Sequence, residues 1–285
     1  MSALDRCRFP AAGTAVTLAV SGGADSLALL VLAARAGLRA TAIHVDHGLR
    51  DRSSDEADVV RDAATRYGLA FRAESVRVGH GPNLEARARA ARRAVLPPDA
   101  LTGHTADDQA ETVLLNLMRG SGLDGVRGIG SPERRPLLDL RRAETHALCA
   151  SESLDPVVDA SNDDPAFTRN RVRHELLPFL GDIGRRDAVP LLCRLARQAT
   201  DDVALLDDLA AALDPTDAKA IAAAPGALAR RALRAWLRPY LEGYPPDAAA
   251  VERVLAVARG EAIATDVVAG VSVRRTSGRL RVVRS

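Results

Sequence analysis

The 285-residue chain contains almost no lysine: Lys219 is the only one, so 38 of its 39 basic side chains are arginine. A Walker A loop requires GxxxxGK[ST], and the absence of lysine from the first half of the chain excludes it; the turn between the first predicted strand and helix does not carry GxGxxG either. Aromatic residues make up 3% of the chain, and there are three cysteines. Cys7, Cys149 and Cys193 are scattered and form no CxxC pair, which argues against a disulfide framework, a zinc site or a sulfur-carrying dithiol.

Long hydrophobic runs are also missing. The longest uncharged apolar run near the start, residues 27–34, is far shorter than the roughly 18 to 20 residues that span a bilayer. The first ten residues carry Asp5, Arg6 and Arg8 and have no apolar segment typical of a signal peptide. We therefore expect a cytoplasmic protein with no membrane partner.

The composition is that of a folded protein, with 47% hydrophobic and 27% charged residues, enough for one large or two medium domains. The 39 basic and 37 acidic residues leave a formal charge of +2. The excess of arginine over lysine fits GC-rich codon usage, but guanidinium groups also bind phosphates bidentately. Both explanations can hold, so only the positions of the arginines can indicate whether they bind a phosphate-bearing partner.

The first half of the chain alternates between predicted strands and helices. Strands are expected at 15–20, 40–45, 70–76 and 100–103, and helices at 26–36, 53–67, 84–96 and 107–118. Ser53 and Glu56 form a capping box for the second helix, which Gly68 ends. This alternation predicts an α/β fold with a parallel twisted sheet and helices on both faces. Ligands in such sheets bind at the carboxyl ends of the strands.

The second half has a different pattern. Glycines at 120–136 predict a loop without regular elements, and proline and glycine at 178–184 predict a break. Long helical patterns follow at 187–213, 227–241 and 248–259, and then strands at 263–268, 271–276 and 279–283, the last two joined by a Ser277-Gly278 hairpin turn. We expect two domains, a nucleotide-binding domain at 1–183 and a small helical domain ending in strands at 184–285.

The strongest chemical signal lies between the first strand and the first helix, in the sequence SGGADS. Glycines let the backbone turn tightly and present bare N–H groups, and the start of the next helix adds partial positive charge, so the loop is suited to an anion. The serine hydroxyls can donate to phosphate oxygens, and the aspartate can hold Mg²⁺. The loop consists of Ser21, Gly22, Gly23, Ala24, Asp25 and Ser26.

This hexapeptide resembles the PP-loop of the N-type ATP pyrophosphatases, which split ATP into AMP and pyrophosphate. Further motifs follow in order: HVDHGLR at 44–50, NLEARARAAR at 83–92, GHTADDQAET at 103–112, LMRGSG at 117–122, and SND with FTRNRVRHELLP at 161–178. Together they resemble the tRNA(Ile)-lysidine synthase family, in register from about residue 16 to residue 180.

The resemblance implies an activity. A ligase of this family adenylylates O2 of the wobble cytidine of the CAU-anticodon isoleucine tRNA with ATP and Mg²⁺. Free L-lysine then displaces AMP, forming lysidine at C2, so that the tRNA reads AUA as isoleucine. The alternatives are another PP-loop tRNA-modifying enzyme, such as a thiolase, or a non-catalytic ATP-binding protein. Family resemblance also points to a homodimer.

Two carboxylates are candidates for binding lysine. Asp108 and Glu111 are three residues apart on the helix after His104, so they project to one side and suit an ammonium group. One of them, or His104 through water, is the expected base, although two acids here could simply favour the helix dipole. The resemblance adds His44, His47 and His104 to the ATP site and makes Arg92, with Asp25, Asp108 and Glu111, a catalytic residue.

Arginines gather where a polyanion would lie. Arg89 and Arg92 are three apart on one helix, and Arg119 lies within the LMRGSG motif. Arg169, Arg171 and Arg173 suit the anticodon backbone, or else form an exposed helix face. The last 15 residues carry five arginines, including Arg274 and Arg275, and no acid, which suits tRNA phosphates or serves solubility.

Overall fold

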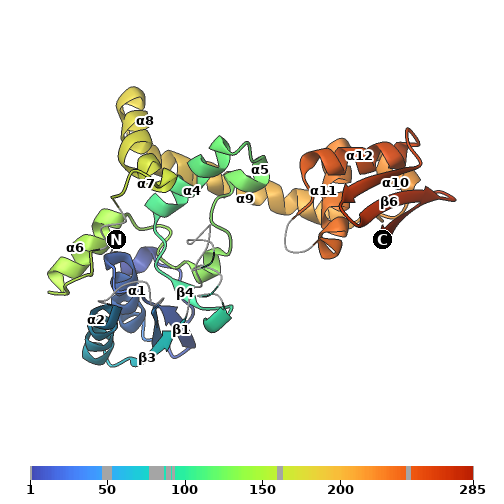
Figure 1. The fold of residues 1–285 in the computed structure, drawn as a ribbon. Coiled ribbons are helices and arrows are strands. Elements are labelled where there is room, and N and C mark those ends of the chain that lie inside the picture. The colour runs from blue at the N-terminus through green and yellow to red at the C-terminus, as the bar shows by residue number, and fades with distance from the viewer. Residues whose placement is uncertain are drawn as a thin grey trace. The chain divides into compact units, whose positions relative to one another are not determined.

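The computed structural model describes residues 2–46, 53–76, 87, 91, 94–158, 163–241 and 245–284. The chain forms two compact units, Met1–Arg197 and Gln198–Ser285, which are described separately below. Figure 1 shows the elements of each unit coloured along the chain. The part of the chain that the structure describes has no helix of the length and apolar character that a membrane span requires.

A parallel sheet forms the centre of the first unit. Its strands are β1 (Ala15–Ala19), β2 (Arg39–Asp46), β3 (Ala70–Ser75) and β4 (Leu101–Thr102), in the order β3-β2-β1-β4. Every pair is parallel, with Ala15 opposite Arg39 and Leu18 opposite Leu101. The predicted α/β class with a parallel sheet is confirmed, and the four strands lie within two residues of their expected bounds.

The core of this unit is built around α1 (Ala24–Arg35), whose residues 27–33 are almost completely buried. Such a helix is apolar on all sides because it is covered all round. α2 (Ser53–Arg66) packs against β2 and β3, and α6 (Arg142–Ser151) lies along α1. The sequence pattern did not predict α6. The helix expected at 84–96 falls mostly outside the described residues.

The strand order creates a switch point between β1 and β4. From β1 the chain proceeds to β2 on one side, whereas β4 pairs with β1 on the other side. Neighbouring strands whose connections leave in opposite directions form a crevice at their carboxyl ends, and ligands of open α/β sheets bind there. The SGGADS loop follows β1, and α4 (Ala106–Met118) follows β4.

The glycine-rich segment 120–136 is more regular than expected. It contains α5 (Leu123–Val126) and a 3-10 turn, η2 (Pro132–Arg134). Two amides of α4 hold it: Gln109 accepts from the backbone of Ile129 and donates to that of Arg127, and Asn116 donates to Gly125. The prediction of no regular element was wrong here because side chains outside the segment supply its hydrogen bonds.

The break expected at 178–184 is also wrong. α7 (Thr168–Arg171), a π-helical turn η4 (Val172–Leu176) and α8 (Leu177–Gly184) follow one another without interruption. Pro178 stands in the first turn of α8, where its missing N–H is tolerated, and the widened π turn precedes it. The helix ends at Arg185, whose φ of 50° is left-handed.

The second unit combines helices with a small antiparallel sheet. Its elements are the end of α9 (Ala188–Ala211), α10 (Ala218–Ala223), α11 (Gly226–Leu237), η5 (Arg238–Tyr240), α12 (Ala248–Arg259), β5 (Ala264–Val268), β6 (Val271–Thr276) and β7 (Arg279–Arg284). Val267, Val273 and Leu280 of the strands pack on the helices. Ser277 and Gly278 both have positive φ, which confirms the predicted hairpin turn.

The units divide inside α9. Its early residues Val189 and Cys193 pack on α4, and Ala210 near its end joins the core of the second unit. The division therefore falls after Arg197, and a boundary at 183/184 remains a prediction from the sequence. A continuous helix gives no compositional signal at such a point.

Candidate active site

The SGGADS loop is shaped as an anion-binding turn. Gly22 has a φ of 87°, a left-handed value that favours glycine, and Gly23 caps the 12-residue helix α1. The hydroxyl of Ser26 donates to the carbonyl of Gly23 (2.8 Å) and accepts from the N–H of Ser21 (3.1 Å). Ser26 thus holds the turn in place, and the positive end of the α1 dipole faces the ligand side.

A second glycine brings the β4–α4 connection against this loop. A Cβ placed on Gly103 would lie 2.5 Å from the backbone oxygen of Asp25. Only a residue without a side chain permits this approach. The GHTADD motif therefore lies directly beside the first turn of α1, as the switch point requires.

Two of the predicted histidines lie at this edge of the sheet. His44 of β2 is buried, with Nδ1 3.1 Å from the carbonyl of Val20, just before the loop, and its Nε2 has no hydrogen-bond partner among the residues that the structure describes. His104 Nδ1 lies 2.7 Å from the hydroxyl of Thr102. His47 lies outside the described residues.

α6 contributes two side chains to Asp25. Thr145, which is fully buried, donates to Oδ1, and Nε of Arg142 lies 3.4 Å from Oδ2. Burial raises the pKa of Asp25, and the hydrogen bond from Thr145 opposes that rise. Neither Arg142 nor Thr145 was predicted from the sequence, because none of the family motifs lies in α6.

Asp108 caps its own helix and also meets arginines. Its Oδ2 accepts from the backbone N–H and the hydroxyl of Thr105, both at 2.9 Å, which begins α4 with a capping box. Its Oδ1 accepts from Arg142 (2.9 Å) and Arg169 (3.0 Å). Burial pushes the pKa of Asp108 upward, but these two guanidinium groups and the Thr105 N–H outweigh it, so the pKa is lowered.

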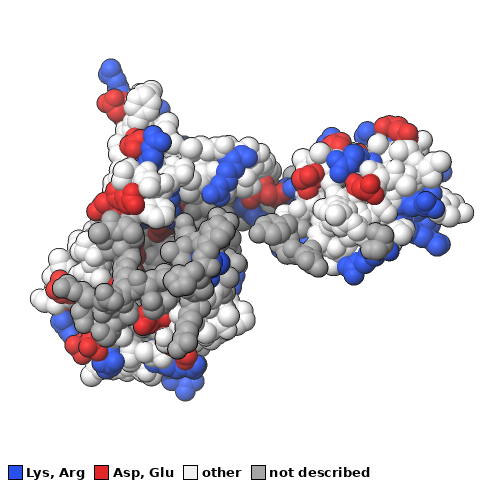
Figure 2. Space-filling view, in the orientation of Figure 1, with Lys and Arg blue, Asp and Glu red and all other residues white. Residues whose placement is uncertain are grey.

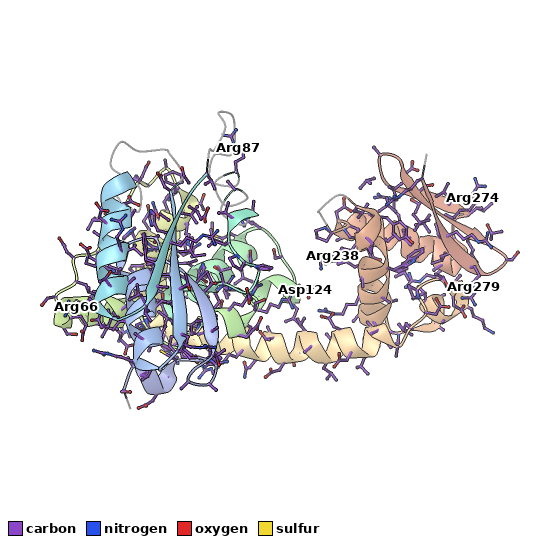
Figure 3. All side chains as sticks on the ribbon, turned by 90° about the horizontal axis from the view of Figure 1, so that it is seen from below. Arg66, Arg87, Asp124, Arg238, Arg274 and Arg279 are labelled. Carbon is purple, nitrogen blue, oxygen red and sulfur yellow. The ribbon has the colours of Figure 1, made fainter. Side chains whose placement is uncertain are left out.

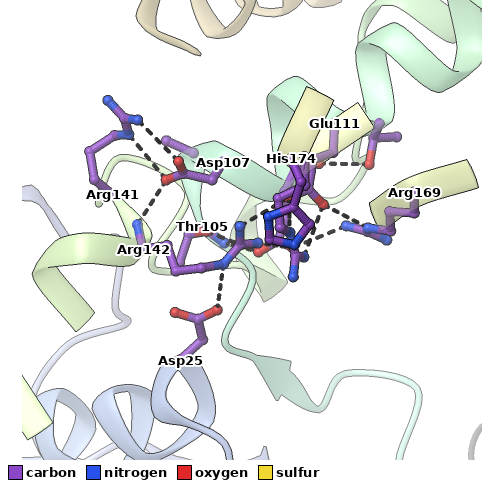
Figure 4. Close-up of polar contacts among 12 residues, drawn as sticks. Asp25, Thr105, Asp107, Glu111, Arg141, Arg142, Arg169 and His174 are labelled. Atoms are coloured by element: carbon purple, nitrogen blue, oxygen red, sulfur yellow. Dashed lines mark hydrogen bonds and ion pairs between the residues drawn. The ribbon is translucent and has the colours of Figure 1, made fainter. Parts of the chain in front are cut away.

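Glu111 is the most enclosed member of the site, with a side chain that is 0% exposed. Oε1 accepts from Arg142 (3.0 Å) and Arg173 (2.7 Å), and Oε2 accepts from Arg169 (2.7 Å) and, more weakly, Arg173 (3.3 Å). Figure 4 shows this cluster between α4, α6 and α7. Three carboxylates, of Asp25, Asp108 and Glu111, therefore face the guanidinium groups of Arg142, Arg169 and Arg173.

The ion pair of Asp107 with Arg141, next to this cluster, connects the helices that support it. Asp107 accepts from Nε and Nη2 of Arg141 and from the backbone N–H of Arg142, at 2.8–3.1 Å. Arg141 also contacts Asp187, which precedes α9. These bonds lower the pKa of Asp107 against the effect of its burial and join the beginnings of α4, α6 and α9.

The remaining arginines expected in the first unit do not join this cluster. Arg171 is exposed and pairs with Glu175 four residues on, and Arg119 is exposed after α4. Arg89 and Arg92 lie outside the described residues. The structure thus brings Asp25, Asp108, Glu111, Arg169 and Arg173 together and leaves Arg119 and Arg171 out of the cluster.

In the second unit the strands present arginine outward. Arg274 of β6 lies directly opposite Arg281 of β7, and both are exposed. Arg275 points the other way and donates to the carbonyl of Ala258, and Arg279 pairs with Asp214. Figure 2 shows blue side chains at the strand edge of this unit, and in Figure 3 Arg274 and Arg279 project from the sheet.

The cysteines take no part in the site. Cys7, Cys149 and Cys193 are free thiols that donate to three different carbonyls, those of Ala3, Ala24 and Ala106. Burial raises the pKa of each thiol to about 11. Among the residues that the structure describes, no three His, Cys, Asp or Glu side chains are placed to hold a metal ion.

Comparison with known proteins assigns the chain to a family. Residues 3–180 match the PP-loop domain, and residues 217–281 match the TilS substrate binding domain. A tRNA(Ile)-lysidine synthase from Nocardia farcinica is 46% identical, covering 80% of this chain and 77% of the relative. The chain belongs to the tRNA(Ile)-lysidine synthase family. A family member from Salinispora tropica is 40% identical and covers 94% of this chain and 90% of its own.

The family resemblance predicted from the motifs is therefore confirmed, as is the PP-loop fold. Among solved structures, the U34-tRNA thiolase NcsA from Methanococcus maripaludis has a TM-score of 0.55 at 16% identity, covering 69% of this chain and 76% of its own. At that identity the similarity concerns the fold alone. The two matched ranges, which end at 180 and begin at 217, leave the predicted domain boundary between them.

Proposed function

We propose that this protein joins free L-lysine to C2 of the wobble cytidine in the CAU-anticodon isoleucine tRNA, converting ATP to AMP and pyrophosphate. One observation carries the proposal: Arg142 contacts both Asp25 of the anion-binding loop and the carboxylates of Asp108 and Glu111. A loop suited to triphosphate and a carboxylate pair suited to an ammonium group therefore share one site. Membership of the family supplies the reaction.

The described residues fit ATP. The turn at Gly22 and Gly23, at the beginning of α1, offers backbone N–H groups to phosphates. His44 is a further candidate for the nucleotide, because its Nδ1 lies 3.1 Å from the carbonyl of Val20, just before the loop, and its buried Nε2 has no hydrogen-bond partner among the described residues. We assign ATP to the crevice between β1 and β4.

Asp25 fits Mg²⁺. Its Oδ1 is held by Thr145, and in the described part of the chain its Oδ2 has only the 3.4 Å contact to Arg142, so this oxygen can take a cation. Magnesium often binds through one or two carboxylates and completes its shell with phosphate oxygens and water. When bound, the ion neutralises phosphate charge and favours departure of pyrophosphate.

The chemistry requires two transfers. In the first, O2 of cytidine forms a bond to the α-phosphorus and pyrophosphate leaves; arginines of the site offset the charge of two polyanions. In the second, the side-chain amine of lysine bonds to C2 and AMP leaves. The amine has a reference pKa of about 10.4 and must lose protons. Asp108, Glu111, or His104 through water, are the candidate acceptors.

The exposed arginines of the second unit are assigned to tRNA phosphates. Like charges directly opposite on neighbouring strands repel each other, as Arg274 and Arg281 do, and a phosphate between them removes the repulsion. In the first unit, exposed Arg119 and Arg171 are candidates, and Arg89, which lies outside the described residues, stays a prediction from the sequence. Arg275, which the sequence favoured, donates within its own unit instead.

Incubation with ATP, Mg²⁺, radiolabelled lysine and the CAU-anticodon isoleucine tRNA tests the proposal. We expect one lysine per tRNA with stoichiometric AMP and pyrophosphate. Nucleotide binding without lysine transfer would contradict it. A thiolase would instead incorporate sulfur, but the three separate cysteines, two of them buried and all with a raised thiol pKa, offer no reactive thiolate for that chemistry.

A further inference from the structure

Asp108 has no acceptor position left for a lysine ammonium group. A carboxylate offers about four lone-pair positions. Oδ1 receives Arg142 and Arg169, and Oδ2 receives two donors from Thr105. The Thr105 bonds begin the helix and are part of its fold, so only the Oδ1 contacts can be exchanged.

Glu111 is equally saturated. Its four contacts come from Arg142, Arg169 and Arg173, and the side chain has no exposed surface. A substrate ammonium group can therefore reach the two carboxylates only if a guanidinium group leaves. An arginine can leave only if another acceptor for its guanidinium group lies nearby.

Arg142 differs from the other two in its third contact. Among the described residues, Arg169 donates to Asp108 and Glu111 and Arg173 donates to Glu111, whereas Nε of Arg142 also faces Asp25 of the PP-loop at 3.4 Å. That distance is longer than the 2.9–3.0 Å of its other two contacts. A triphosphate in the loop would offer Arg142 strong new acceptors, since guanidinium groups bind phosphate bidentately.

We propose that Arg142 occupies the ammonium position of the substrate lysine and turns to the phosphates when ATP binds. Asp108 Oδ1 and Glu111 Oε1 are then the two atoms that receive the ammonium group. The inference rests on the proposed function and adds an order to it, in which nucleotide binds before lysine.

Charge balance supports this order. Three carboxylates and three guanidinium groups are matched in a largely buried cluster, and a further buried cation without a new anion is strongly unfavourable. ATP brings the anions. Its phosphates take up Arg142, and the lysine ammonium restores the balance at Asp108 and Glu111.

Equilibrium dialysis with radiolabelled lysine tests the inference without turnover. In wild-type protein, Mg²⁺ and an ATP analogue that cannot be cleaved between the α- and β-phosphates should raise lysine affinity by about 5- to 150-fold, the usual range of coupling between sites. By reciprocity lysine should raise analogue affinity by the same factor. Equal lysine affinity with and without analogue would overturn the inference, and this comparison needs no variant.

Arg142→Gln supplies the second arm. It should bind lysine without nucleotide at least as tightly as wild-type protein binds it with analogue, and the coupling should fall to near one. Arg6→Gln, which removes a different arginine contact to α6 through Glu144, should keep wild-type coupling. A folded Arg142→Gln protein that retains the coupling would refute the role of Arg142. Lysidine formation with nucleotide-independent lysine affinity would refute this inference alone, whereas failure to form lysidine would refute the proposed function.

Discussion

The hydroxyl of Thr145 donates to Oδ1 of Asp25, joining α6 to the first turn of α1. The bond fixes the carboxylate that we assign to Mg²⁺ and leaves its other oxygen toward Arg142. Thr145 is completely buried, so no water can replace its hydroxyl without rearrangement.

Thr145→Val should therefore weaken the magnesium site. Loss of a residue that orients a metal ligand typically costs about 10- to 100-fold in affinity or activity, and we expect the Mg²⁺ concentration at half-maximal lysidine formation to rise by about 10-fold. Thr145→Ser, which keeps the donor, should restore the wild-type Mg²⁺ dependence. An unchanged Mg²⁺ titration in a folded Thr145→Val protein would show that the bond does not position Asp25.

Gly103→Ala should disturb the crevice. Its new Cβ would lie 2.5 Å from the backbone oxygen of Asp25, so α1 and β4 must separate. We expect a loss of about 1–3 kcal/mol in the free energy of unfolding, with weaker binding of an ATP analogue. Gly130→Ala is the control, because open space surrounds that position. Equal stability of the two variants in denaturant titrations would contradict the close approach.

Removal of the facing arginines of the second unit should affect tRNA alone. In Arg274→Gln/Arg281→Gln protein we expect weaker tRNA binding and a salt-dependence slope reduced by about two, one for each lost phosphate contact. Because the pair repels in the free protein, thermal stability should not fall. Filter binding at several salt concentrations measures the slope.

The matched control for that experiment is Arg230→Gln, since Arg230 is an exposed arginine of α11 that pairs with Glu252. It should leave the salt slope unchanged. Identical slopes for the double variant and the control would assign the tRNA contacts to other residues.

The three thiols should resist alkylation in the folded protein. Thiolate is the reactive form, and a pKa of about 11 leaves only a minute fraction ionised at neutral pH. Iodoacetamide at pH 7.5 should modify none of them natively and all three in denaturant, as counted by intact mass. As pH rises toward 11, native modification should increase. Rapid labelling of the folded protein at neutral pH would contradict this prediction and would favour the alternative function as a thiolase.

Local sequence signals predicted the sheet, α1, α4 and the C-terminal hairpin because each rests on short-range patterns. Glycines at 22 and 103 and the acids at 108 and 111 identified the crevice through the family motifs. The missing parts depend on contacts between distant segments: Arg142 and Thr145 meet Asp25 across more than 100 residues, and Gln109 orders a segment rich in glycine. No periodicity records such contacts.

The break expected at Pro178 failed for a related reason. Proline is tolerated in the first turn of a helix, and Pro178 lies in the first turn of α8, directly after the π turn η4. A count of arginines could not predict that Arg275 points away from Arg274. Successive side chains of a strand lie on opposite faces of the sheet, and both residues belong to β6.

The use of arginine in place of lysine around Glu111 and Asp108 has a consequence for kinetics. Guanidinium groups remain protonated throughout the working pH range, and the carboxylates raise the pKa of Arg142 further. Lys219, the only lysine in the chain, belongs to α10, so no lysine is among the described side chains of this cluster. The pH–rate profile can therefore be measured with lysine and with an analogue of different amine basicity. If its alkaline limb shifts between the two, that limb reports the titration of the substrate amine.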